Sequence, residues 1–81
     1  MLFRSAAGRA EDAAVQFEKA IELEPFYALP WFALGKASDR LGRKPRAIEA
    51  YQGFILRAHG GLRGDLKTAN ERLQALKSGG P

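Results

Sequence analysis

Few side chains in this sequence are of a type that catalyses reactions or binds metal ions. His59 is the only histidine and there is no cysteine, which excludes thiol catalysis and cysteine-based metal sites. The acids Asp39 and Asp65 have no general base and no further metal ligand close to them in the sequence. His59 follows a helical pattern, and an imidazole at the negative end of a helix needs no further role. We therefore expect no enzyme activity, no metal ion and no cofactor.

Two other short segments resemble functional motifs, but each has a simpler explanation. Glu11 and Asp12 are adjacent acids near the start of a helical pattern, where negative charge is favoured. Residues 60–64 read GGLRG, which is as rich in glycine as a phosphate-binding loop. This segment lacks the Gly-Lys-Ser/Thr ending of such a loop, and no strand precedes it. Neither segment predicts catalysis.

The basic residues raise the question of nucleic-acid binding. The chain has 13 Lys and Arg against 9 Asp and Glu, a net charge of +4, and most of the cations are interleaved with acids. The densest basic cluster lies in one predicted turn and consists of Arg40, Arg43, Lys44 and Arg46. A solvated turn is the simpler interpretation, so nucleic acid is not the favoured partner. The alternative is a basic edge that also includes Arg9 and binds phosphates with a strong salt dependence.

The elements that position these side chains are predicted to be helices. The sequence is rich in helix-forming residues and poor in β-branched ones. Helical patterns cover about residues 9–24, 28–41, 45–58 and 62–77. Proline and glycine mark their ends, because Pro25 cannot continue a helix and Gly42 suits a left-handed cap. Short turns between them predict an all-α fold of antiparallel helices, and no apolar run approaches the roughly 18 residues of a membrane span.

Apolar residues recur at spacings of three and four, which places them on one face of each helix. In the first segment this face consists of Ala10, Ala13, Ala14, Phe17, Ala20 and Ile21. In the last segment it is a narrow seam, suited to a single neighbour, of Leu62, Leu66, Ala69, Leu73 and Leu76.

The chain is similar to itself at an offset of 34 residues. The matching positions are Gly8-Arg9 with Gly42-Arg43, Ala13 with Ala47, Phe17 with Tyr51, and Ile21 with Ile55. A period of 34 residues in a helix–turn–helix setting is typical of the tetratricopeptide repeat, and residues 28–61 resemble one full unit of that family. The signature positions present are Trp31, Leu34, Gly35, Ala47 and Tyr51, and the departures are Ser38, Phe54 and His59. The preceding half-unit supplies Ala13, Phe17, Ala20 and Pro25.

This resemblance, over residues 6–76, implies a short right-handed α-solenoid of stacked antiparallel hairpins. Gly35 and Ala47 would be small where two helices of a hairpin approach closely, with large side chains beside them. The implied packing core is Ala13, Phe17, Ala20, Trp31, Leu34, Gly35, Ala47, Tyr51 and Phe54. A three-helix bundle unrelated to the family is the alternative, and it would bury the same aromatic residues.

The resemblance also divides the chain. Residues 1–7 would be the remnant of a truncated helix or an artefactual N-terminus, and residues 8–25 the second helix of a partial repeat. Residues 26–61 would be a complete repeat, residues 62–77 a capping helix and residues 78–81 a flexible tail. On this division we expect the chain to be a piece of a longer repeat array.

Function is implied by the resemblance as well: a non-catalytic module that binds a peptide or helix of a partner protein in a concave groove. The implied groove residues are Leu29, Phe32, Lys36, Asp39, Arg40, Arg63, Lys67 and Asn70. Phe32 would be an exposed aromatic anchor, or else it packs under a neighbouring repeat. Some family members clamp a peptide carboxylate, for which Arg63 and Lys67 are suitably placed, but Ala33 stands where an asparagine is needed. Association of two copies through the open face of the first helix is a further alternative.

Overall fold

A computed structural model of the chain describes residues 6–59 and 61–78, and every element in these ranges is an α-helix. The helices are α1 (Ala6–Leu23), α2 (Ala28–Arg40), α3 (Lys44–Arg57) and α4 (Arg63–Lys77). The predicted all-α fold is therefore confirmed, and the largest difference is that α1 begins at Ala6 rather than near Arg9. Residues 6 and 7 are the first two residues of α1. The interpretations of residues 1–5 and 79–81 fall outside the described residues.

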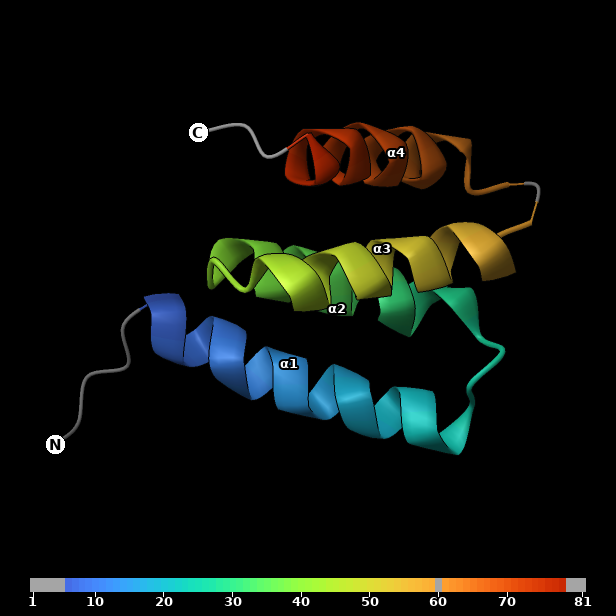
Figure 1. Ribbon diagram of the computed structural model, residues 1–81. Coiled ribbons are helices and arrows are strands. Elements are labelled where there is room, and N and C mark those ends of the chain that lie inside the picture. Colours follow the sequence, from blue (N-terminus) through green and yellow to red (C-terminus); the bar gives the residue numbers. More distant parts are fainter. Residues whose placement is uncertain (1–5, 60, 79–81) are drawn as a thin grey trace, which may run out of the picture.

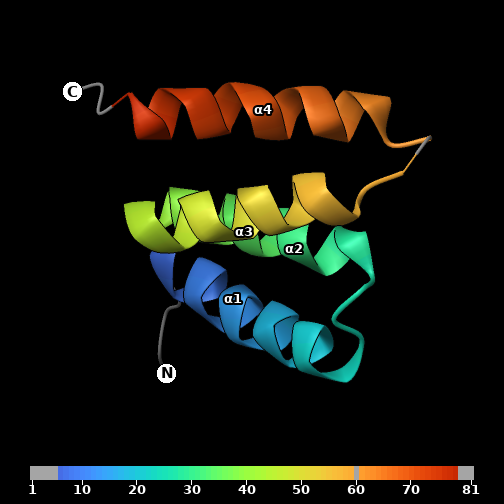
Figure 2. The ribbon, with the colours of Figure 1, turned by 45° about the vertical axis from the view of Figure 1, so that its right-hand side comes forward.

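Consecutive helices run in opposite directions and lie side by side (Figures 1 and 2). α2 and α3 form the central pair, α1 packs on α2, and α4 packs mainly on α3 with a smaller contact to α2. α1 and α4 therefore flank the central pair on different sides (Figure 2).

The turn between α2 and α3 is fixed by backbone hydrogen bonds around a glycine. Gly42 has a φ of 73°, in the left-handed region that favours glycine. The N–H of Gly42 donates to the carbonyl of Asp39 at 3.1 Å, and the N–H of Arg43 donates to that of Ser38 at 2.9 Å. These two bonds are the Schellman motif that ends many helices. Pro45, in the first turn of α3, then starts the next helix without losing an intrahelical bond.

Two clusters of buried side chains hold the helices together. One joins α2, α3 and α4 and consists of Ala28, Phe32, Ala47, Tyr51, Phe54, Ala69 and Leu73. The other joins α1, α2 and α3 and consists of Ala14, Leu34, Ala37 and Ala50, with Phe17 and Ile21 packed against it. α2 contributes to both clusters, so it is buried on two faces.

Glycine allows α2 and α3 to approach at two places. A Cβ built on Gly35 of α2 would lie only 2.7 Å from Cδ1 of Tyr51, and one built on Gly53 of α3 would overlap the ring of Trp31. The sequence pattern predicted close packing at Gly35 but not at Gly53. A glycine inside a helix is unfavourable by about 1 kcal/mol relative to alanine. The presence of Gly53 in a predicted helix therefore indicated a place where a larger side chain would not fit.

The other end of the central pair is joined to the α1–α2 turn by polar contacts. The carbonyl of Pro25 accepts hydrogen bonds from Trp31 Nε1 at 3.1 Å and from Arg57 Nε at 2.6 Å. The Arg57 guanidinium carbon also lies 4.0 Å from the centre of the Trp31 ring, a cation–π geometry. Trp31 is therefore in contact with both Gly53 and Arg57 of α3.

Substitution of Gly53 tests this packing. Gly53→Ala should lower the free energy of unfolding by about 1–3 kcal/mol, because overlap with Trp31 outweighs the better helix propensity of alanine. Gly64→Ala is the matched control, since a Cβ there meets nothing within 4 Å. Urea unfolding of both variants gives the comparison. Equal stability of the two variants would contradict the close approach of Gly53 and Trp31.

Candidate functional site

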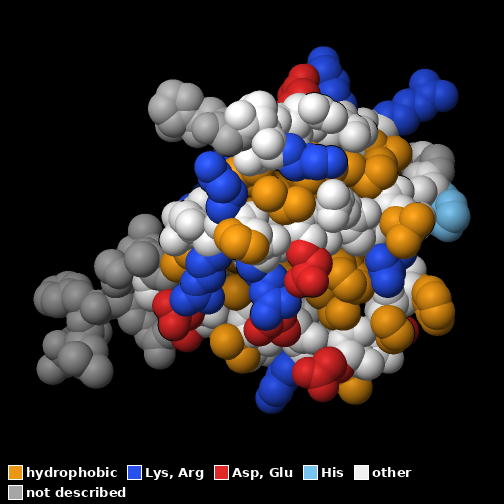
Figure 3. Space-filling view, viewed as in Figure 1, with side chains coloured by type: hydrophobic (Ala, Val, Ile, Leu, Met, Phe, Trp, Pro, Cys, Tyr) orange, Lys and Arg blue, Asp and Glu red, His pale blue; other side chains and the backbone are white. Residues whose placement is uncertain are grey.

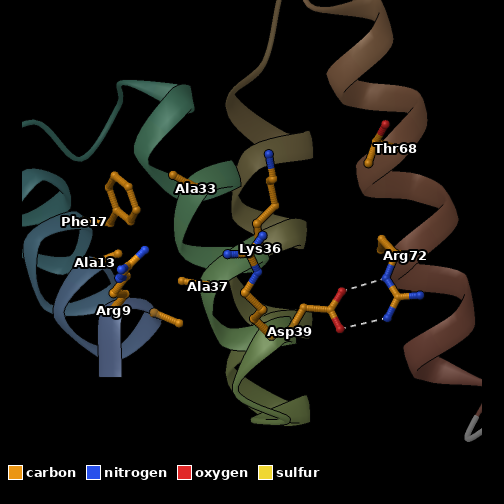
Figure 4. Close-up of a pocket in the computed structure, with 11 residues that line it drawn as sticks. Arg9, Ala13, Phe17, Ala33, Lys36, Ala37, Asp39, Thr68 and Arg72 are labelled. Carbon is orange, nitrogen blue, oxygen red and sulfur yellow. Dashed lines mark hydrogen bonds and ion pairs between the residues drawn. The ribbon is translucent and has the colours of Figure 1, made fainter. Parts of the chain in front are cut away.

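A hollow of about 670 Å³ lies between α1 and α4, with α2 along its floor (Figure 4). α1 contributes Arg9, Ala13 and Phe17, α2 contributes Ala33, Lys36, Ala37 and Asp39, and α4 contributes Thr68 and Arg72 (Figure 4). Ala10 and Arg40 complete the lining. The hollow brings α4 together with the consecutive helices α1 and α2, from which it is distant in sequence, so it exists only in the folded chain.

The inner surface of the hollow is apolar and made mostly of small side chains. Ala13 and Phe17 stand one turn apart on α1, and Ala33 and Ala37 stand one turn apart on α2. Alanines at these positions leave the space open, and the ring of Phe17 remains only half-buried. The result is a trough with two helical walls and little polar surface at its base.

The rim of the hollow is basic. Arg9, Lys36 and Arg40 are exposed there, and Asp39 is the one acid among the described residues that line it. Asp39 is already paired with Arg72. Arg72 Nε donates to Oδ2 of Asp39 at 2.6 Å, and Arg72 Nη2 donates to Oδ1 at 2.8 Å. The three remaining cations therefore give the hollow a positive potential.

Asp39 is the centre of a polar network that joins α2, α3 and α4. Besides the bond from Arg72, its Oδ2 accepts a hydrogen bond from the Tyr51 hydroxyl at 3.1 Å. The bonds from Arg72 hold the pKa of the Asp39 carboxyl below its ordinary value of 3.8, against the opposing effect of burial. Burial, followed by the nearby Asp39 charge, raises the pKa of Tyr51 to about 12. Tyr51 is thus neutral and Asp39 ionised over the physiological pH range.

The prediction that Phe32 is an exposed anchor is wrong. Phe32 is buried, with its ring 4.8 Å from that of Phe54 and 6.2 Å from that of Tyr51. Lys36 covers the ring, with Nζ 5.2 Å from its centre. The alternative was packing under a neighbouring repeat, but the ring contacts of Phe32 lie within the α2–α3 hairpin, and the cluster that includes it extends to Ala69 and Leu73 of α4. The physical reason is that α3 and α4 together cover the face of α2 that carries Ala28 and Phe32.

Of the other predicted groove residues, some line the hollow and some do not. Lys36, Asp39 and Arg40 line the hollow, whereas Leu29 is exposed outside it. The predicted α4 residues Arg63, Lys67 and Asn70 are also exposed and do not line it, and the Asn70 amide donates to the carbonyl of Leu66 at 3.0 Å.

Thr68 and Arg72, which line the hollow from α4, were missed by sequence analysis. Each stands one position before a buried residue of α4, Ala69 or Leu73. The apolar seam of α4 could therefore have indicated that Thr68 and Arg72 lie beside its buried face. Asp39, predicted to face a partner, instead binds Arg72 and Tyr51 within the chain.

The basic turn does not form a continuous basic edge. Arg43 pairs with Glu11 of α1 at 3.2 Å, and Arg46 pairs with Glu18 at 3.2 Å and Glu49 at 3.1 Å. Basic and acidic side chains are interspersed over this face of the molecule (Figure 3). These exposed pairs contribute little stability, but they reduce the charge available to a phosphate backbone.

A separate apolar patch lies at the turn between α1 and α2. Leu23 and Phe26 are more than four-fifths exposed there, at 82% and 86%, and Tyr27 is half exposed. The patch lies at the C-terminal end of α1, away from the N-terminal part of α1 that carries Arg9. It is therefore distinct from the hollow.

Metal and membrane sites are not indicated. Within residues 6–59 and 61–78, no three histidine or acidic side chains are grouped so that they could hold a metal ion. His59 is exposed, and Asp65 lies in the first turn of α4. Among the helices described, none is long and apolar enough to cross a membrane.

Comparisons with known proteins give no assignment. No family model, no curated protein and no solved structure matches the chain. The features that bear on function are therefore the apolar trough, its basic rim and the network that joins the three helices.

The network around Asp39 predicts a pH dependence of stability. Because the folded-state pKa of Asp39 is lowered, the stabilisation by its ionised form is fully present above pH 3.8 and is lost as the pH falls through the lower folded-state value. Asp39→Asn should lower the free energy of unfolding by about 1 kcal/mol at pH 7. The difference from the original chain should narrow below pH 3.8, as measured by urea unfolding. Glu71→Gln, at an exposed acid on α4, is the control, and a pH-independent effect of Asp39→Asn would contradict the account.

Proposed function

We propose that this chain is a non-catalytic protein-interaction module of the tetratricopeptide type that binds a segment of a partner protein in the hollow between α1 and α4. The observation that carries the proposal is the combination of an apolar trough with three exposed cations at its rim, Arg9, Lys36 and Arg40. Apolar concavities with a few convergent polar groups are the usual form of binding sites.

The packing of the helices supports the repeat interpretation. α2 and α3 form an antiparallel hairpin in which Gly35 lies against Tyr51, and both are signature positions of the family. α4 packs on α3 and also touches α2, which is how a further helix would extend a stack of hairpins. An unrelated helical bundle could have the same contacts between α2 and α3. The repeat interpretation therefore also depends on the similarity of the sequence to itself at an offset of 34 residues.

The chemistry of the hollow favours a protein segment over a small metabolite or a nucleic acid. The hollow is open along the helices, and alanines form its base. An apolar side chain or the outside of a helix can contact these alanines without giving up hydrogen bonds to water. The guanidinium groups of Arg9 and Arg40 can each bind a carboxylate with two parallel hydrogen bonds. A nucleic acid would need a continuous basic surface, whereas Arg43 and Arg46 are paired with acids.

Self-association is the second candidate, and one observation favours it. The apolar face of α1 around Ala13 and Phe17 is only half-buried, so a second copy would gain by covering it. Sedimentation over a range of protein concentrations separates this candidate from the first.

A selection experiment tests the proposed function. We expect display of natural protein segments on phage to yield ligands whose binding falls by at least about tenfold with Lys36→Glu, because that change reverses a charge at the rim. Lys67→Glu is the matched control, since Lys67 is an exposed helical lysine outside the hollow. Ligands that bind both variants equally would place the binding surface elsewhere.

A further inference from the structure

A second pocket, of about 480 Å³, lies between α1 and α3, on the side of the molecule from which Figures 1 and 3 are viewed. We call it the acidic pocket. Its lining consists of Glu18, Ile21 and Glu22 of α1, Trp31 and Leu34 of α2, and Arg46 and Glu49 of α3. The acidic pocket shares no lining residue with the hollow between α1 and α4. An inference from it therefore goes beyond the proposed function and does not rest on it.

The floor of the acidic pocket is apolar and fixed in position. Leu34 is 3% exposed, and Ile21 is packed against the same buried cluster. Trp31 is held in one orientation, because its Nε1 donates to the carbonyl of Pro25 at 3.1 Å and its ring leaves no room for a Cβ on Gly53. Such a floor suits the methylene stem of a long side chain, which covers apolar surface while its polar head stays at the rim.

The rim of the acidic pocket is negatively charged. Three carboxylates, those of Glu18, Glu22 and Glu49, stand against the single cation of the described lining, Arg46. Glu18 and Glu49 are each paired with Arg46, at 3.2 Å and 3.1 Å. Glu22, one turn after Glu18 on α1, is exposed and has no ion pair within residues 6–59 and 61–78. Negative charge therefore remains unpaired here, although the whole chain carries a net charge of +4.

Arg46 shows which kind of charged group the rim accommodates. Its guanidinium lies between α1 and α3, with Nη2 3.2 Å from Oε2 of Glu18 and Nη1 3.1 Å from Oε1 of Glu49. A planar cation therefore fits between the carboxylates of the two helices. Glu22 can bind a second guanidinium whose stem lies on the apolar floor.

We propose that the acidic pocket binds an arginine side chain of a partner protein. A guanidinium binds a carboxylate with two parallel hydrogen bonds, is less strongly hydrated than an ammonium group and stacks on aromatic rings, so arginine suits this pocket better than lysine. The Trp31 ring already has such a contact within the chain, with the guanidinium carbon of Arg57 4.0 Å from its centre. Free arginine is a poorer ligand, because its α-carboxylate would lie near the acidic rim.

A series of short peptides tests the inference. Acetyl-Ala-Arg-Ala-amide, and the same peptide with lysine or citrulline in place of arginine, are titrated into the 81-residue chain. Trp31 is the only tryptophan, so its fluorescence and its indole NMR signals report binding at this place. We expect saturable changes with the arginine peptide and an affinity at least about fivefold above that of the citrulline peptide, which has the same shape without the charge. The lysine peptide and free arginine should bind more weakly than the arginine peptide.

Removal of the unpaired carboxylate should weaken binding. Glu22→Gln should lower the affinity for the arginine peptide at least about fivefold, because its guanidinium loses a charged partner. Glu71→Gln is the matched control, since Glu71 is an exposed acid on α4 outside the acidic pocket. This control should bind as the original chain does.

Removal of the competing cation should strengthen binding. Arg46→Gln should raise the affinity for the arginine peptide at least about threefold, because it leaves Glu18 and Glu49 available to the peptide. Arg63→Gln makes the same change in net charge outside the acidic pocket and should have little effect. A gain of affinity cannot arise from loss of folding, so this variant separates binding from stability.

Three results would overturn the inference. Equal affinity of the arginine and citrulline peptides would show that the charge of the rim does not select the ligand. Unchanged binding by Glu22→Gln, with chemical-shift changes that gather around Phe17 and Ala33, would place the arginine in the hollow instead. Absence of saturable changes at Trp31, in both the original chain and Arg46→Gln, would show that the acidic pocket binds no arginine side chain.

Discussion

The close approach of α2 and α3 determines where the other two helices pack. Gly35 of α2 admits the ring of Tyr51, and Gly53 of α3 admits the ring of Trp31. With each helix carrying a glycine opposite a ring of its partner, the two helices can interlock at short distance. This interlocking buries Tyr51 and places its hydroxyl within reach of Asp39, from which the network to Arg72 follows.

The position of α4, and with it one wall of the hollow, follows from the same contact. Tyr51 and Phe54 present a surface on which Ala69 and Leu73 pack, and the pairing of Arg72 with Asp39 fixes the rotation of α4. α1 is held on the other side by Leu34 and Ala37 of α2 and by the ion pairs of Arg43 and Arg46. Asp39 and Arg72 thus join helices, whereas Lys36 and Arg40 remain exposed at the rim of the hollow.

Periodicity predicted the helices well, and the sequence held less information about the site. Spacings of three and four, with Pro25, Gly42 and Pro45 as end markers, predicted all four helices within the described residues. The burial of Phe32 could not be predicted, because it depends on how α2 packs against Tyr51 and Phe54 of α3 and on α4, which completes the same cluster. The pairing of Asp39 with Arg72, 33 residues away, likewise depends on the rotation of α4. Local patterns set the helices, whereas the lining of the hollow is set by how they pack.

Nuclear Overhauser spectroscopy of the 81-residue chain can measure how closely α2 and α3 approach at the two glycines. We expect strong cross-peaks between the Hα protons of Gly35 and the ring protons of Tyr51, and between the Hα protons of Gly53 and the ring protons of Trp31. The Gly53 protons should also be shifted by the ring current of the indole. Absence of both sets of cross-peaks in the folded chain, with the Tyr51 ring accessible to solvent, would show that α2 and α3 do not interlock at these glycines.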